Sequence, residues 1–229
     1  MFDGQVNFLE ELVLIDRQTN FTNALLIAAL VNIVLIGFSV LSTHNLLNRL
    51  TVNFLKLSWR DNEFSENLRM STGTSLALIA NYLLSLGLCF FLTINNITSP
   101  QNALVFSLIG VATLFVIQQL SFRLIVFSTG EKGIIPTLAL ITRHIWKFSG
   151  IVFLLIAIVW ILNQNLSQIW RSFFLIFLAT TLLLRLLKGF LFMNRVGLSW
   201  YYFILYLCTL EILPFVLIIG WLIWVFRLK

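Results

Sequence analysis

The chain has 229 residues, of which 59% are hydrophobic and only 10% are charged, and its mean hydropathy is +0.97. A typical soluble domain carries about 25% charged residues, so this composition leaves too little polar surface to cover a soluble core of this length. The net charge of +6 would suggest nucleic-acid binding in a soluble protein, but here the basic residues stand between apolar segments. We therefore exclude a soluble domain and a nucleic-acid-binding protein, and expect one all-α membrane domain over residues 1–229.

Six segments are long and apolar enough to cross a membrane, since a helix needs about 20 mostly apolar residues to do so. The predicted spans cover residues 21–42, 72–94, 103–127, 140–162, 169–187 and 200–226. The acidic N-terminus lacks the positive region and cleavage site of a secretory signal, so the first span is expected to stay in the mature protein. The fourth span has a short unbroken apolar part, and the segment IIPTLALITRH is alternatively an interfacial helix that begins at Pro136.

The loop after the first span, residues 44–60, has the pattern of an amphipathic helix. Its apolar face is predicted to carry Leu47, Leu50, Phe54 and Leu57. Its polar face is predicted to carry Asn45, Arg49, Asn53, Lys56 and Arg60. This pattern favours an interfacial helix on the cytoplasmic side, with Trp59 as an anchor and with Arg49, Lys56 and Arg60 against anionic lipids. The alternative is an extension of the first span that packs on neighbouring helices.

The distribution of basic residues predicts how the spans are oriented, because cytoplasmic loops carry an excess of Lys and Arg. Eleven of the fifteen fall on one side: Arg49, Lys56, Arg60, Arg69, Arg123, Lys132, Arg143, Lys147, Arg185, Lys188 and Arg195. The other side has Arg17, Arg171, Arg227 and Lys229. The first side is therefore predicted to be cytoplasmic, with both termini outside. The basic C-terminal tail argues against this, so a five-span or re-entrant ending stays open.

Polar residues recur at one depth of the predicted bundle. They are Asn32, Asn81, Gln118, Gln119, Thr180, Thr181 and Glu211. At 1.5 Å per residue they lie roughly 10–16 Å from the cytoplasmic boundary. Asn, Gln and Thr commonly form hydrogen bonds between membrane helices, worth less than about 2 kcal/mol each. The layer is therefore interpreted as structural for these residues, with an ion or partner site as the alternative.

The last predicted span holds a carboxylate close to a residue that breaks helices. Glu211 lies near the middle of the span, where an ionised group is costly unless it is paired, protonated or hydrated. Three residues later, Pro214 supplies no backbone N–H and kinks the helix, which leaves carbonyl acceptors beside Glu211. Together they predict a site for a cation, a proton or a donor from a partner. Arg123, His144 and Arg185 are the alternative charge partners of this carboxylate.

The string LYLCTLEILP, which includes Glu211 and Pro214, resembles the terminal signature of a protein family. This family comprises uncharacterised multi-span inner-membrane proteins from Bacteroidota and is known only as a domain of unknown function. The resemblance covers nearly the whole chain and is most specific from Tyr206 to Pro214; the stretch EKGIIP and the basic loop after the first span are similar but looser. It implies a location in the bacterial inner membrane and supports Glu211 and Pro214 as signature residues. It assigns no reaction.

The sequence offers no constellation of residues that is typical of an enzyme active site, such as a nucleophile beside a histidine, paired carboxylates or a phosphate loop. Cys89 and Cys208 have no CxxC or Cys/His spacing, so we expect no metal, disulfide or cofactor. The function predicted by elimination is a non-enzymatic scaffold or accessory subunit of an envelope assembly. It would dock membrane-protein partners, or further copies of itself, through intramembrane polar groups. The alternative is a small transporter or lipid carrier that uses Glu211 and the kink at Pro214.

Overall fold

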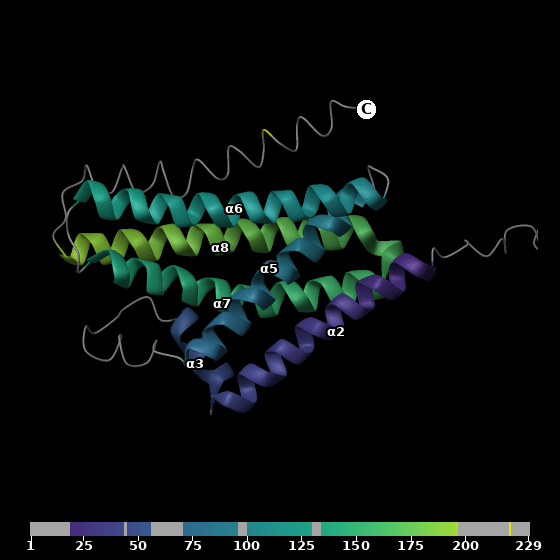
Figure 1. Cartoon of the computed structure of the whole chain (residues 1–229), viewed down its shortest axis with the longest axis horizontal. Coiled ribbons are helices and arrows are strands. Elements are labelled where there is room, and N and C mark those ends of the chain that lie inside the picture. Colours follow the sequence, from purple (N-terminus) through teal and green to yellow (C-terminus); the bar gives the residue numbers. More distant parts are fainter. Residues whose placement is uncertain are drawn as a thin grey trace, which may run out of the picture.

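The computed structural model describes residues 19–43, 45–55, 71–95, 100–129, 134–196 and 220, and every regular element in these ranges is helical. In chain order the elements are α2 (Thr19–Ser42), α3 (Leu46–Leu55), α5 (Thr72–Asn95), α6 (Pro100–Thr129), α7 (Ile134–Leu162), the 3-10 helix η1 (Gln164–Leu166) and α8 (Ser167–Val196). In Figure 1 the axes of α6, α7 and α8 lie roughly parallel, with the chain of α7 running opposite to that of α6 and α8, and α5 and α2 cross them obliquely. The predicted all-α fold is confirmed for this part of the chain.

Four helices are long and apolar enough to cross a membrane by length and composition. These candidate spans are Asn23–Ser42, Thr72–Asn95, Ala139–Leu162 and Ser167–Leu191, and they match the first, second, fourth and fifth predicted spans. The third predicted span, 103–127, lies within α6, whose described apolar part covers Gln101–Thr113. The sixth, 200–226, lies outside the described residues except for Gly220.

The fourth span is one continuous helix. α7 runs without a break from Ile134 to Leu162, so the segment that begins at Pro136 does not form a separate interfacial helix. Pro136 is the third residue of α7, where its missing N–H would have no partner within the helix in any case. The first turn of a helix tolerates proline for this reason, and the helix continues through it.

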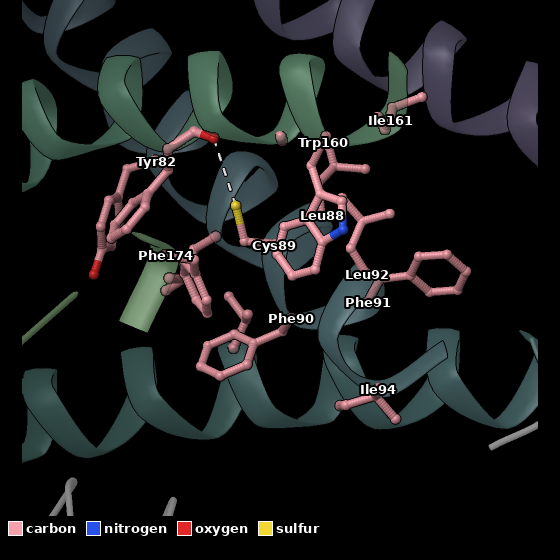
Figure 2. Packing of buried hydrophobic residues seen from close by; sticks show 14 of the residues in the cluster. Tyr82, Leu88, Cys89, Phe90, Phe91, Leu92, Ile94, Trp160, Ile161 and Phe174 are labelled. Carbon is pink, nitrogen blue, oxygen red and sulfur yellow. Dashed lines mark hydrogen bonds between the residues drawn. The ribbon is translucent and has the colours of Figure 1, made fainter. Parts of the chain in front are cut away.

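Helices α7 and α5 are central to the described bundle, because α7 packs against α2, α3, α5, α6 and α8, and α5 packs against α2, α6 and α7. The tightest approach is between α5 and α7, where a Cβ added to Gly150 would lie only 2.7 Å from the Cα of Tyr82. The two backbones therefore come together where a side chain larger than hydrogen does not fit, as is common between membrane helices. Along the same pair, the Cys89 thiol donates to the Phe153 carbonyl at 3.5 Å, drawn as the dashed line in Figure 2.

Aromatic rings fill the space between α5, α7 and α8. Phe153 is fully buried, and its ring meets Phe174 and Phe177 edge-on at centroid distances of 5.5 and 5.3 Å. Phe90 meets Phe174 edge-on at 5.6 Å, and Figure 2 shows these two rings beside Cys89 and Trp160. Edge-to-face rings add attraction beyond the area that they bury. Because lipid tails are as apolar as these side chains, this close packing is what holds the helices together in a membrane.

Short polar contacts fix the connection between α2, α3 and α5. The hydroxyl of Ser71 accepts from the backbone N–H of Thr74 at 3.3 Å and so caps the start of α5. The hydroxyls of Thr43 and Thr74 lie 3.3 Å apart, which ties the end of α2 to the start of α5. Between α2 and α3, Asn45 has a φ of 57°, a left-handed conformation that asparagine tolerates better than most residues. The chain reverses there, and α3 folds back onto the end of the bundle.

Candidate functional site

The structure places the two asparagines of the predicted polar layer inside the bundle. Asn32 and Asn81 are both completely buried. Asn32 Nδ2 donates to the Ala28 carbonyl at 3.0 Å, and Asn81 Oδ1 accepts from the Ser85 hydroxyl at 3.4 Å. The remaining amide atoms, Asn32 Oδ1 and Asn81 Nδ2, have no hydrogen-bond partner among the described residues. These side chains face the chain's own helices and not a surface that a separate protein could reach.

The other members of the predicted layer do not all join them. Thr181 is buried, whereas Thr180 is exposed and donates to the Ile176 carbonyl of its own helix at 2.8 Å. Gln118 and Gln119 belong to α6, but their side chains are outside the described part of the structure, as are Glu211 and Pro214. The predicted layer is thus described for α2, α5 and α8 only, and on α8 just one of the two threonines points inward.

A second group of polar side chains lies between α7 and α8, near the start of α7 and the end of α8. This basic cluster consists of His144, Lys147, Arg185 and Lys188, whose exposed fractions are 3%, 5%, 2% and 3%. Lys147 and Lys188 both lie close enough to interact electrostatically with the His144 ring, and the Arg185 guanidinium lies 5.9 Å from the centre of the Trp146 ring. All nine acidic residues of the chain lie outside the described residues.

Helix α3 covers this cluster and contacts two of its members. Lys188 Nζ donates to the Phe54 carbonyl at 2.7 Å and lies 5.5 Å from the centre of the Phe54 ring. The Phe54 ring in turn stacks on Phe148 of α7 at 4.1 Å, and the backbone of Leu50 lies close to the His144 ring. The last carbonyls of a helix have no donor within it, and its C-terminal end attracts cations. Lys188 therefore supplies a cap that the ten-residue helix lacks by itself.

The buried face of α3 differs from the predicted one. Leu46, Leu50 and Phe54 are buried, whereas Leu47, which we expected on the apolar face, is 51% exposed. Both sets follow helical spacing, and the partners decide between them, because Leu46 and Leu50 pack with Leu78 of α5. The alternative of a helix packed on its neighbours therefore describes residues 46–55 better than a helix whose apolar face lies in lipid.

The predicted lipid-facing residues, and one predicted charge partner of Glu211, lie outside the described side chains. Arg49 and Arg123 belong to α3 and α6, but their side chains lie outside the described part, and Lys56 and Arg60 lie outside it altogether. His144 and Arg185, named as possible partners of Glu211, are both in the basic cluster. Within the described helices, no group of three His, Cys, Asp or Glu side chains lies together as a metal site would require.

Sequence reasoning named His144 and Arg185 singly and missed that Lys147 and Lys188 complete a buried group with them. The sequence did contain a pattern that indicates this group, because His144 and Lys147 are three residues apart, as are Arg185 and Lys188. Residues at this spacing share one face of a helix. Two such pairs at the same end of adjacent antiparallel spans predict a shared basic site.

Comparison with known proteins identifies the family of the chain. The family model described as "Domain of unknown function (DUF4271)" matches residues 25–222. The chain therefore belongs to this family, as the resemblance to a domain of unknown function suggested. No curated protein and no solved structure matches the chain.

Proposed function

We propose that this member of the DUF4271 family is a non-enzymatic scaffold or accessory subunit of a membrane assembly in the bacterial inner membrane. The observation that carries the proposal is the position of α2 at the edge of the bundle. Among its described side chains only Ala29, Asn32 and Ser39 are buried, and they form one narrow stripe against the rest of the chain. A span held along a single stripe leaves most of its surface for contact with other molecules in the membrane.

The outer face of α2 suits another transmembrane helix. Ile27, Leu30, Val34 and Leu41 lie on the side opposite the buried stripe, with exposed fractions of 65%, 61%, 61% and 89%. Ile27, Val34 and Leu41 follow one another at intervals of seven residues, a spacing that keeps them in line along a packed pair of helices. Because Asn32 and Asn81 face inward, the proposed docking uses this apolar face and not the intramembrane polar groups.

Photo-crosslinking in intact membranes tests this proposal. A photoreactive amino acid is placed at Leu30 or Val34 on α2, and at Ile176 or Leu183 on α8 as matched exposed controls. A docked partner gives a discrete protein adduct from the α2 positions alone, and its mass separates a second copy of the chain from a different protein. Lipid on both faces gives no adduct at either set of positions, which would refute the scaffold.

The second candidate is a small transporter or lipid carrier, which the proximity of Glu211 to Pro214 favours. A carboxylate beside freed carbonyls is the arrangement of broken-helix sites that handle cations or protons. Glu211→Gln preserves the side-chain shape and removes the charge. Under the carrier hypothesis this change abolishes proton- or cation-coupled uptake into vesicles while the protein still folds. Under the scaffold hypothesis it leaves partner crosslinking unchanged.

A further inference from the structure

Helix α3, which covers the basic cluster, is too short to be stable without its neighbours. It has ten residues, and an isolated helix shorter than about 12–15 residues is marginal in water. Its apolar side chains are docked on the bundle, Leu46 and Leu50 with Leu78 of α5 and Phe54 with Ile145 of α7. Whether α3 stays folded therefore depends on the groups that lie beneath it.

The His144 ring of α7 lies beneath this helix. The ring is 3% exposed, and the backbone of Leu50 lies close to it. Its Nε2 atom is buried and has no hydrogen-bond partner among the described residues. In a protonated ring both nitrogens carry a hydrogen, so Nε2 would become a buried donor without an acceptor on a buried cation. His144 lies five residues from the Ala139 end of the α7 span, about 8 Å inside it at 1.5 Å per residue, so a release of α3 would bring the ring to water.

The described charged groups around the ring are cations. Lys147 of α7 and Lys188 of α8 both act on His144 electrostatically. Arg185 of α8 is also buried, beside Trp146, whereas Arg143 of α7 is exposed. A proton on His144 would therefore add another positive charge to a buried group that already holds three, and like charges oppose this.

The other helices around the cluster add no described charge that would offset such a proton. The sequences of α2 and α5 contain no acidic or basic residue. The side chains of Arg49 in α3 and Arg123 in α6 lie outside the described part, as does His44, the second of the two histidines of the chain. All nine acidic residues lie outside it as well. A response to pH that came from these carboxylates would not depend on His144.

We propose that His144 is a pH-sensitive switch that controls α3: the neutral ring allows α3 to cover the bundle, and protonation of the ring releases the helix. The direction follows from the number of bound protons. The covered ring resists a proton and the released ring accepts one, so acid favours the released state. A histidine in water takes up its proton near pH 6.5. The cover is therefore complete above about pH 7.5 and loosens as the pH falls through about 6.5.

Hydrogen exchange of the full-length protein in a neutral detergent tests the switch. Exchange of the α3 amides is measured at pH 7.5 and 5.5, and each rate is compared with the intrinsic rate of an unfolded peptide at the same pH. At pH 5.5 a released histidine is about 90% protonated, so the protection of α3 should fall about tenfold. Protection in the buried part of α5 should not change. A constant protection of α3, or an equal fall in α5, would overturn the proposal.

Single variants of the two histidines, His44 and His144, locate the response. His144→Gln retains a neutral polar side chain that takes up no proton, so the protection of α3 should become equal at the two pH values. His44→Gln is the matched control and should retain the tenfold fall. A tenfold fall that persists in His144→Gln would assign the response to the acidic residues, and its loss in His44→Gln would assign it to the other histidine. Either result would overturn the proposal.

Thiol labelling gives a measurement in which His144 is unchanged. In a chain whose natural cysteines, Cys89 and Cys208, are replaced by alanine, Leu50→Cys places a thiol on the buried face of α3 and Leu47→Cys places one on its exposed face. The ratio of the two labelling rates cancels the effect of pH on the thiol itself. Labelling at position 50 relative to position 47 should rise about tenfold between pH 7.5 and 5.5. A ratio that does not rise would overturn the proposal.

Discussion

The α7–α8 pair has two halves that are held together in different ways. In one half, Phe153 packs against Phe174 and Phe177. These apolar rings need no hydrogen-bond or charge partner when they are buried. In the other half, the same two helices bury Lys147, Arg185 and Lys188, which repel one another and require acceptors. Those acceptors come in part from α3, a separate helix. The aromatic half is thus self-sufficient, whereas the basic half depends on what covers it.

The largest effect is expected in the aromatic half. Phe153→Ala removes a fully buried ring from three aromatic contacts and should lower the free energy of unfolding by about 3 kcal/mol or more. Phe173→Ala on the exposed face of α8 is the control and should cost much less. Unfolding in mixed micelles measures both. Equal losses would show that the ring cluster does not determine stability.

The crossing of α5 and α7 gives the next largest effect. Gly150→Ala places a Cβ 2.7 Å from the Cα of Tyr82 and 3.0 Å from Asn81 Nδ2, so the helices must separate at a cost of about 1–3 kcal/mol. Gly37→Ala is the matched control, because a Cβ at Gly37 has nothing within 4 Å and alanine favours helix formation. The same micelle assay should show a loss for the first variant and none for the second. A neutral Gly150→Ala would mean that the two helices are not closely packed.

In the basic half, removal of the lysine cap should loosen α3 and leave the aromatic core intact. Lys188→Met retains most of the side-chain length but loses the donor to the Phe54 carbonyl, a bond to a charged group that is worth about 1.5 kcal/mol or more. Hydrogen exchange of the α3 amides should become about tenfold faster, while exchange in the buried part of α5 should not change. Arg171→Met at the far end of α8 controls for the loss of a cation. Unchanged exchange in α3 would show that Lys188 does not hold this helix.

The smallest effect is expected at the buried polar contact of α5. Ser85→Ala removes the hydroxyl that donates to Asn81 Oδ1 at 3.4 Å. Hydrogen bonds between membrane helices average about 0.6 kcal/mol, and we expect this long bond within one helix to contribute no more. A change of this size is at the limit of the micelle assay. A loss several times larger would mean that Asn81 and Ser85 belong to a wider hydrogen-bond network.

Most of the fold could be predicted from the sequence, because the length of an apolar segment is enough to identify a span. The four candidate spans agree with predicted spans to within a few residues. The direction in which each helix faces was harder to predict. α2 is apolar around its whole circumference apart from a few residues, so its pattern does not reveal that the stripe through Asn32 is the buried one. In α3 both Leu46 and Leu47 fit the helical period, and only the position of Leu78 on α5 selects Leu46.

The candidate site was predicted in part. Asn32 and Asn81 were expected at the same depth, and both are buried. Their depth follows from counting residues, but the reason for their burial, close packing of α5 on α2 and α7, is a property of the assembled bundle. The basic cluster was missed as a group because lysine near the end of a span ordinarily extends to water. Here α3 covers that end of the bundle, and the sequences of α7 and α8 contain no pattern that predicts that these lysines are covered.

The central claim is that the basic half lies at the cytoplasmic headgroup level and the opposite ends of the helices lie outside. Cysteine accessibility in intact cells tests it most directly, in a chain whose natural cysteines, Cys89 and Cys208, are replaced by alanine. Single cysteines are placed in turn at Asn62, Lys132, Asn96 and Asn165. A membrane-impermeant thiol reagent is expected to label the positions at Asn96 and Asn165 and to leave those at Asn62 and Lys132 unlabelled until the cells are opened. The reverse pattern would place the basic half outside and contradict the account.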